Sequence, residues 1–215
     1  MDLPSVLFNS IIQILVKFWW LIPVLFILGF LQSSYFKGKV GERRVKSASS
    51  RLDSNQYTIF HDVTLPTADG TTQIDHIIIS EQGIFVIETK NYSGWIFGSE
   101  KNRFWTQVIY KTKNKFQNPL FQNYKHIKTL QGLLQLPLQY FHSVVVFADD
   151  STFKIQLPAN IIKDYQLNNC ISRFEETLLD AQQVIDARCK IEDHRLQPGF
   201  KTNQEHIQNL SKNRG

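Results

Sequence analysis

Two apolar runs joined by a short polar turn, between residues 73 and 90, leave little freedom in how this chain folds. The runs read QIDHIII and IFVIETK, and Ser-Glu-Gln-Gly at positions 80–83 separates them. Runs rich in isoleucine, valine and phenylalanine that flank a glycine-containing turn are typical of a β-hairpin. Both runs are apolar on both faces, which predicts a strand pair that is covered on both sides, in the middle of a sheet.

The length of the turn decides which side chains of this hairpin meet. A two-residue turn at 81–82 places Asp75 directly opposite Glu88. Side chains paired in this way project from one face, with Cβ atoms about 5 Å apart. Lys90 returns to that face because the side-chain period of a strand is two. A three-residue loop would shift the register and separate these groups. The two-residue turn therefore predicts that two carboxylates and an ammonium group gather at one place.

Such a cluster has a recognisable chemistry. Two neighbouring carboxylates repel each other unless one takes up a proton or both bind a cation. Mg²⁺ and Mn²⁺ accept carboxylate oxygens, and Mg²⁺ keeps several bound waters. A lysine beside such an ion can orient or deprotonate the attacking water, or stabilise charge on a phosphate. The alternative interpretation is a hairpin whose outer face carries ordinary surface charges.

Further blocks surround the hairpin. Gly-Lys-Val-Gly-Glu at 38–42 precedes it, and Trp105, NPLFQN at 118–123 and FHSVVVF at 141–147 follow it. In this order and spacing, residues 37–150 resemble the nuclease-related domain, NERD, a distant relative of the PD-(D/E)XK nucleases. The resemblance implies an α/β fold with a mixed central sheet flanked by helices, and a metal-dependent phosphodiesterase site.

The resemblance also implies roles for individual residues. Asp75 and Glu88 match the metal-binding acids, and Lys90 matches the motif lysine. Glu42 matches an acid on the preceding helix that completes many such sites, and Gln122 resembles a family glutamine near the site. The implied catalytic residues are thus Asp75, Glu88, Lys90 and Glu42, and the three acids among them are the implied ligands of Mg²⁺ or Mn²⁺.

Two further patterns bear on nucleic-acid binding. The net charge of +5 favours anionic partners, either nucleic acid or phospholipid head groups. Lys111, Lys113 and Lys115 share one face if the strand expected at 104–110 continues through them, and such a row suits a phosphate backbone. A solvated strand edge is the other interpretation. A helix beginning at Asn118-Pro119 carries Gln122 and His126 off its apolar stripe, facing either the acids or water.

The N-terminal segment has a separate character. Residues 11–31 are almost wholly apolar, apart from Lys17 and Pro23, and about 20 helical residues can cross a hydrocarbon core. Six basic residues lie between 37 and 51, after the apolar segment, whereas Asp2 is the only charged residue among positions 1–10. The positive-inside rule then predicts a single-pass anchor with the N-terminus outside and the domain in the cytoplasm. Anionic lipid near Lys37–Arg51 is a further expected contact.

These observations predict a membrane anchor at 1–34, a nuclease-like core at 35–150, an α/β extension at 151–196 and a polar tail at 197–215. Two cysteines without C-x-x-C spacing argue against a disulfide framework or a zinc ribbon. The leading hypothesis is a membrane-anchored, cytoplasmic, metal-dependent nuclease, with DNA as the expected substrate. The alternatives are a nucleic-acid-binding module without turnover, tethered at the membrane, and an adaptor that contacts lipid.

Overall fold

The computed structural model describes residues 13, 16–32, 34–68 and 70–197 of the chain. The chain divides into two compact units, Met1–Val40 and Gly41–Gly215. The helix α3 (Ser34–Ser49) runs across the division between them.

The first unit contains helix α2 (Leu21–Gln32), which has no charged residue in its first or last turn. Large apolar side chains in and before this helix are exposed, among them Trp19 at 65% and Phe26 at 76%. Across the described part of the chain, no helix is both long enough and apolar enough to cross a membrane. The span expected at 11–31 is therefore not supported, and residues 11, 12, 14 and 15 of it lie outside the described part.

The second unit is built on a five-stranded mixed sheet with the strand order β1-β2-β3-β7-β9. The first three strands pair antiparallel, whereas β7 pairs parallel with β3 and with β9. The mixed sheet flanked by helices agrees with the expected α/β class, and the hairpin occupies its interior. The strands are β1 (Thr58–Thr67), β2 (Gly70–Ser80), β3 (Gly83–Lys90), β7 (Phe141–Phe147) and β9 (Ile161–Lys163).

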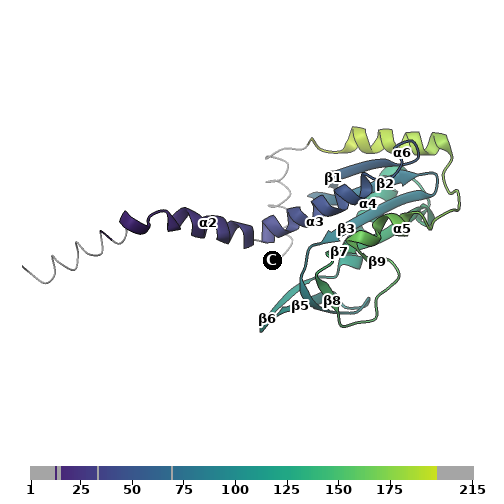
Figure 1. The fold of residues 1–215 in the computed structure, drawn as a ribbon. Helices are drawn as coiled ribbons and strands as arrows, with labels where there is room; N and C mark the ends of the chain where they lie inside the picture. Colours follow the sequence, from purple (N-terminus) through teal and green to yellow (C-terminus); the bar gives the residue numbers. More distant parts are fainter. Residues whose placement is uncertain (1–12, 14–15, 33, 69, 198–215) are drawn as a thin grey trace, which may run out of the picture. The chain divides into compact units, whose positions relative to one another are not determined.

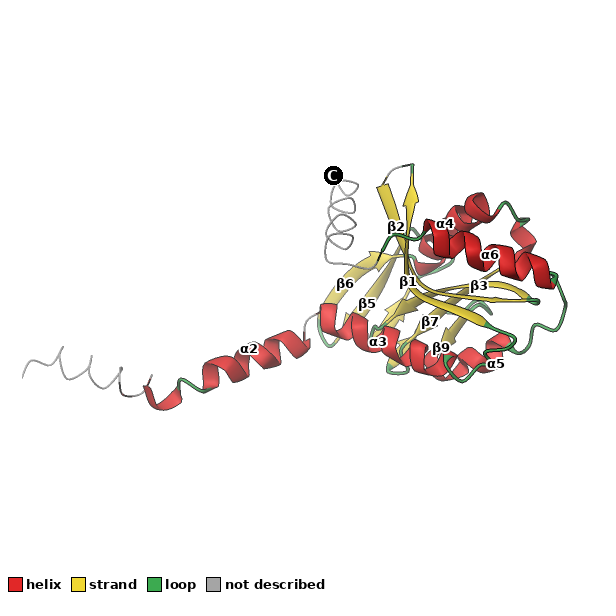
Figure 2. Cartoon of the chain, turned by 90° about the horizontal axis from the view of Figure 1, so that it is seen from above, coloured by secondary structure: helices red, strands yellow, loops and turns green. Residues whose placement is uncertain are grey.

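Helices cover both faces of this sheet, as Figure 2 shows. On one face, Ile77 and Val86 belong to a core with residues of α4 (Pro119–Leu134) and α6 (Ala181–His194). On the other, Ile78 and Phe85 belong to a core with Val45 of α3 and with α5 (Leu167–Ile171). Burying one such side chain stabilises the folded state by about 1.5–3 kcal/mol. The hairpin therefore contributes a large part of the stability of this unit. Two short 3₁₀ turns complete the helical elements, Leu138–Tyr140 and Asp164–Gln166.

The hairpin has the predicted register. Ser80 pairs with Gly83 across a turn at 81–82, and the ladder continues to His76 opposite Ile87. Gly83 has a φ of +121°, a left-handed conformation that glycine adopts without steric cost. The ladder ends at the His76–Ile87 pair, and Asp75 and Glu88 are the next residues of the two strands beyond it.

A second sheet, of strand order β6-β5-β4-β8, packs against β7 and β9 (Figure 1). Its inner side carries Ile96 and Trp105, both fully buried, and the Trp105 ring stacks 6.2 Å from that of Phe147. Its strands are β4 (Gly94–Phe97), β5 (Phe104–Ile109), β6 (Thr112–Gln117) and β8 (Ser151–Phe153).

A shared face for Lys111, Lys113 and Lys115 required the strand expected at 104–110 to continue through Lys115. The strand does not continue that far. The chain reverses at Tyr110, whose φ is +52°, and returns antiparallel as β6. Lys111 therefore lies in the turn, and only Lys113 and Lys115 lie on a common strand face.

Helix α4 begins as predicted. The Asn118 side chain accepts a hydrogen bond from the Leu120 backbone N–H at 2.9 Å, and proline occupies the first helical position. The Asn123 amide donates to the Val86 carbonyl at 2.8 Å and to Ser143 Oγ at 2.9 Å. These bonds tie the polar side of α4 to β3 and β7.

Helix α6 begins with a capping box formed by Asp180 and Gln183. Asp180 accepts a hydrogen bond from the Gln183 backbone N–H at 2.8 Å, and the Gln183 side chain accepts one from the Asp180 N–H at 2.9 Å. This reciprocal cap starts α6 at Ala181, because it satisfies N–H groups that a helix end leaves without partners.

Gly41 lets α3 pass close to the chain that follows β3. A Cβ atom at this position would lie 2.6 Å from Cβ of Asn91, which is closer than real atoms approach. The absence of a side chain thus brings the next residue, Glu42, toward the end of β3 that carries Lys90.

Candidate functional site

Glu88 is the most deeply buried acid of the site, with 1% of its surface exposed. Its Oε1 lies 2.7 Å from Lys90 Nζ, and its Oε2 lies 3.2 Å from His126 Nε2. Burial by itself raises the pKa of Glu88, but the charges and hydrogen bonds of Lys90 and His126 outweigh it and lower the pKa overall. Glu88 is therefore an ionised, paired carboxylate at neutral pH.

Lys90 holds its proton firmly in this arrangement. Its Nζ donates to Glu88 and also to Oε1 of Gln122, at 2.9 Å. Burial lowers the pKa of Lys90, but the carboxylates of Glu88 and Asp75 more than offset that effect, and the pKa is raised. The Lys90 ammonium is therefore held between the Glu88 carboxylate and the Gln122 amide oxygen.

Asp75 lies where β2 and β3 separate. Its Oδ2 accepts a hydrogen bond from the Thr89 backbone N–H at 2.7 Å. Burial raises the pKa of Asp75 well above its ordinary value, and the charges of Glu88 and Glu42 raise it further, against opposing effects of Thr89 and Lys90. Lys90 contacts Glu88 directly, and Asp75 contacts the backbone of Thr89, the residue between them. Of these acids, Asp75 is the one whose pKa is raised by burial and by its neighbours.

Glu42 is partly buried on α3, and its charge acts on Asp75. In the described ranges, however, no group of three or more His, Cys, Asp or Glu side chains is arranged to hold a metal ion. The three-acid ligand set therefore stays a prediction.

Helix α4 supplies the other side of the site. Gln122 and His126 are one turn apart and contact Lys90 and Glu88, so the polar side of the helix faces the acids rather than water. His126 is 4% exposed, and its Nδ1 lies 2.8 Å from Oγ1 of Thr72. Thr72 had no sequence signal, because only the packing of β2 against α4 brings it to this histidine.

The predicted lysines belong to a different part of the unit. Lys113 and Lys115 are exposed on β6, and Lys111 is exposed in the turn before it. Lys113 and Lys115 lie on the second sheet and Lys111 lies in its β5–β6 turn, whereas Asp75, Glu88 and Lys90 lie on the first sheet.

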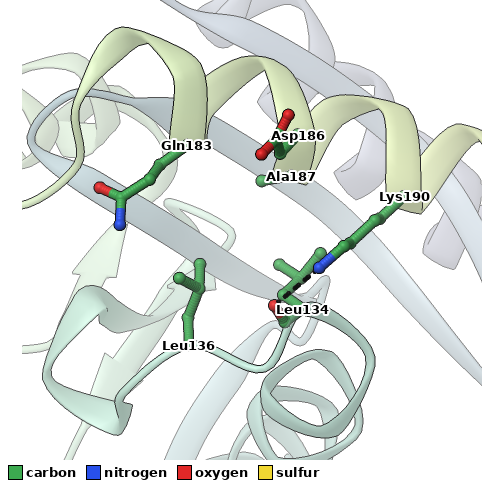
Figure 3. Close-up of a pocket in the computed structure, with 6 residues that line it drawn as sticks. All are labelled: Leu134, Leu136, Gln183, Asp186, Ala187 and Lys190. Carbon is green, nitrogen blue, oxygen red and sulfur yellow. Dashed lines mark hydrogen bonds between the residues drawn. The ribbon is translucent and has the colours of Figure 1, made fainter.

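A small pocket lies elsewhere, between the end of α4 and helix α6 (Figure 3). Lys190 spans it and donates to the Leu134 carbonyl at 3.3 Å. None of the predicted catalytic residues lines it, so the candidate site is the cluster around Glu88. The lining residues are Leu134, Leu136, Gln183, Asp186, Ala187 and Lys190.

Comparison with known proteins bears on the family. A family model described as the nuclease-related domain, NERD, matches residues 37–148, more than half of the chain. The chain belongs to the NERD family. A curated uncharacterized protein of Bacillus anthracis is 42% identical to this NERD protein over 153 residues, 69% of this chain and 72% of the relative. No solved structure matches the chain. Every member of the cluster, from Glu42 to His126, falls within the matched range.

Proposed function

We propose that this NERD protein is a metal-dependent nuclease of the PD-(D/E)XK type, with its site at the end of the β2–β3 hairpin. The observation that supports this most strongly is the Asp75 carboxylate, bound by the Thr89 backbone N–H between Glu88 and Lys90. The charges of Glu88 and Glu42 add to burial in raising the pKa of Asp75. A divalent cation at this place would offset the repulsion between these acids.

The residues fit a hard cation in kind. Mg²⁺ commonly binds through one or two carboxylates and completes its shell with water, so Asp75 and Glu88 are sufficient protein ligands. Glu42 is close enough to act on Asp75 electrostatically and is the third acid that we propose. When bound, the ion would lower the pKa of a coordinated water and neutralise charge on the scissile phosphate.

The remaining side chains hold Lys90 and Glu88 in fixed orientations. Gln122 accepts a hydrogen bond from the Lys90 ammonium, whose positive charge would stabilise a phosphate oxygen of the substrate. His126 contacts Glu88 and is itself fixed by Thr72, so the buried carboxylate keeps one orientation. In this arrangement Asp75, Glu88 and Lys90 come from the main sheet and Glu42 comes from α3. Gln122 and His126 come from α4.

Cleavage of end-labelled single-stranded and duplex DNA and RNA by the full chain tests this function. We expect cleavage in Mg²⁺ or Mn²⁺, none in chelator, and a loss of about 100-fold or more in Asp75→Asn, because a preorganised charge of this kind contributes about that much. Asp186→Asn, an exposed position on α6, is the matched control and should cleave normally. Equal cleavage by wild type and Asp75→Asn would reject the assignment.

We also propose that the first unit attaches the protein to a membrane, with the N-terminus outside and the NERD domain in the cytoplasm. The exposed apolar side chains of residues 16–27 support this, because soluble proteins rarely expose a continuous apolar patch. The basic residues between 37 and 51 support the orientation.

Flotation of the full chain with anionic phospholipid vesicles measures this attachment. Leu25→Glu with Phe26→Glu should shift the protein from the vesicle fraction to the soluble fraction, since each buried charge costs about 2.5–3.5 kcal/mol at a helix centre. The control is Ile185→Glu, which changes an exposed apolar residue on α6. Unchanged flotation of the double variant contradicts the proposal.

A further inference from the structure

The second sheet packs one face against the main sheet, and its opposite, outer face lies outside that core. Inward side chains such as Ile96 and Trp105 pack against the main sheet, so their neighbours along each strand point the other way. On β4, Trp95 and Phe97 are 52% and 38% exposed, and on β5 Phe104 is 51% exposed. Three large aromatic rings on one face are more than solubility alone would leave exposed.

The register places cations in the same rows as these rings. Trp95 pairs with Val108, which pairs with Lys113, and Phe97 pairs with Thr106, which pairs with Lys115. Each of these two rows thus runs from an aromatic ring on β4, through an uncharged residue on β5, to a lysine on β6.

The other edge of the face also carries cations. Lys154, next in the β4–β8 register after Phe153, lies opposite Phe97, and its Nζ is 5.0 Å from the centre of the Trp95 ring. The Arg103 guanidinium lies 5.5 Å from the centre of the Phe104 ring. Among the described strand positions that point outward here, none is acidic. The outward positions are Trp95, Phe97, Phe104, Thr106, Val108, Lys113, Lys115, Gln117 and Thr152.

We propose that this outer face, the aromatic face, binds single-stranded nucleic acid. Unpaired bases would stack on Trp95, Phe97 and Phe104, while the lysines contact the phosphates. Rings between cations on a sheet suit a single strand, because its bases are open to stacking whereas those of a duplex are already stacked. A partner protein recognised through acidic groups would need the cations but would leave the stacking capacity of the rings unused.

This inference rests on the proposed nuclease function and names the form of its substrate. Its test measures binding alone and does not require cleavage. Fluorescence anisotropy of the full chain in chelator, with a labelled single strand of about 15 nucleotides and a duplex of the same sequence, reports binding alone. Wild type should bind the single strand more tightly than the duplex. Asp186→Asn should bind the single strand as wild type does. Because chelator removes the metal and no cleavage is measured, failure of the cleavage proposal leaves this result intact.

Variants of the aromatic face make the test specific. Trp95→Ala and Phe97→Ala should each weaken single-strand binding by about 5-fold to 150-fold, the range that base stacking on one aromatic side chain contributes. Trp95→Phe should retain most of the affinity. Tyr165→Ala, which removes an exposed aromatic ring outside this sheet, is the control and should leave affinity unchanged.

The lysines should act differently from the rings. Lys113→Ala with Lys115→Ala should weaken binding of both the single strand and the duplex. The slope of log affinity against log salt should fall by about 1.4 for the single strand and about 1.8 for the duplex. Circular dichroism checks that each variant is folded. Single-strand affinity that is unchanged in Trp95→Ala and Phe97→Ala, or wild-type binding to the duplex as tight as to the single strand, overturns the proposal.

Discussion

Replacing Lys90 with methionine is expected to destabilise the second unit by about 3–5 kcal/mol, because the change leaves the Glu88 carboxylate buried without its ammonium partner. The His126 contact remains, but it is longer, at 3.2 Å, than the 2.7 Å ion pair that is lost. Urea unfolding of the full chain, followed by circular dichroism, measures the loss. The single variant therefore reports on folding as much as on chemistry.

Glu88→Gln combined with Lys90→Met separates the two effects. The double variant carries no buried charge at this pair, and a neutral replacement of a buried ion pair is often close to neutral in stability. We expect it to recover most of the stability that Lys90→Met loses while cleaving no nucleic acid. A double variant as unstable as the sum of the two single variants would show that the pair does not act as a unit.

Asp75→Asn should stabilise the chain in the absence of divalent metal while abolishing cleavage. Asparagine keeps an oxygen for the Thr89 N–H and removes the charge that burial, Glu88 and Glu42 all oppose. Stabilising changes of this kind are commonly worth about 1 kcal/mol, which raises Tm by about 2–4 °C in a chain of this size. Where the buried charges of a functional site destabilise the fold, removing one of them is expected to raise stability and to lower activity.

The pH dependence has a definite sign. The pKa of Asp75 is raised in the folded chain, so folding is favoured by the bound proton below the ordinary aspartate value of about 3.9. That contribution is lost as pH rises through the raised pKa. The Tm advantage of Asp75→Asn over wild type should therefore grow with rising pH and shrink when Mg²⁺ is added. An advantage that does not vary with pH contradicts this explanation of the raised pKa.

The hairpin could be predicted because two β-prone runs flank a turn that contains a glycine. Two-residue and three-residue turns both remained open, and the observed pairing of Ser80 with Gly83 is that of the two-residue turn. From it follow the positions of Asp75, Glu88 and Lys90. The family resemblance was also confirmed, by the match to residues 37–148.

Other features depend on contacts that sequence periodicity does not encode. The reversal at Tyr110 has no glycine or asparagine to mark it, although Tyr110 adopts a positive φ. Helical spacing shows that Gln122 and His126 leave the apolar stripe of α4, but not that they face Glu88 and Lys90 instead of water. The aromatic face emerges only once the register of four strands is known.

Calorimetric titration of the full chain with Mg²⁺, compared with Asp75→Asn, tests the hydrolytic site most directly. We predict that wild type binds the ion, that Asp75→Asn shows no binding over the same concentrations, and that Asp186→Asn binds as wild type does. Equal heats of binding in wild type and Asp75→Asn, or no heat in wild type, would contradict a metal site at the end of the β2–β3 hairpin.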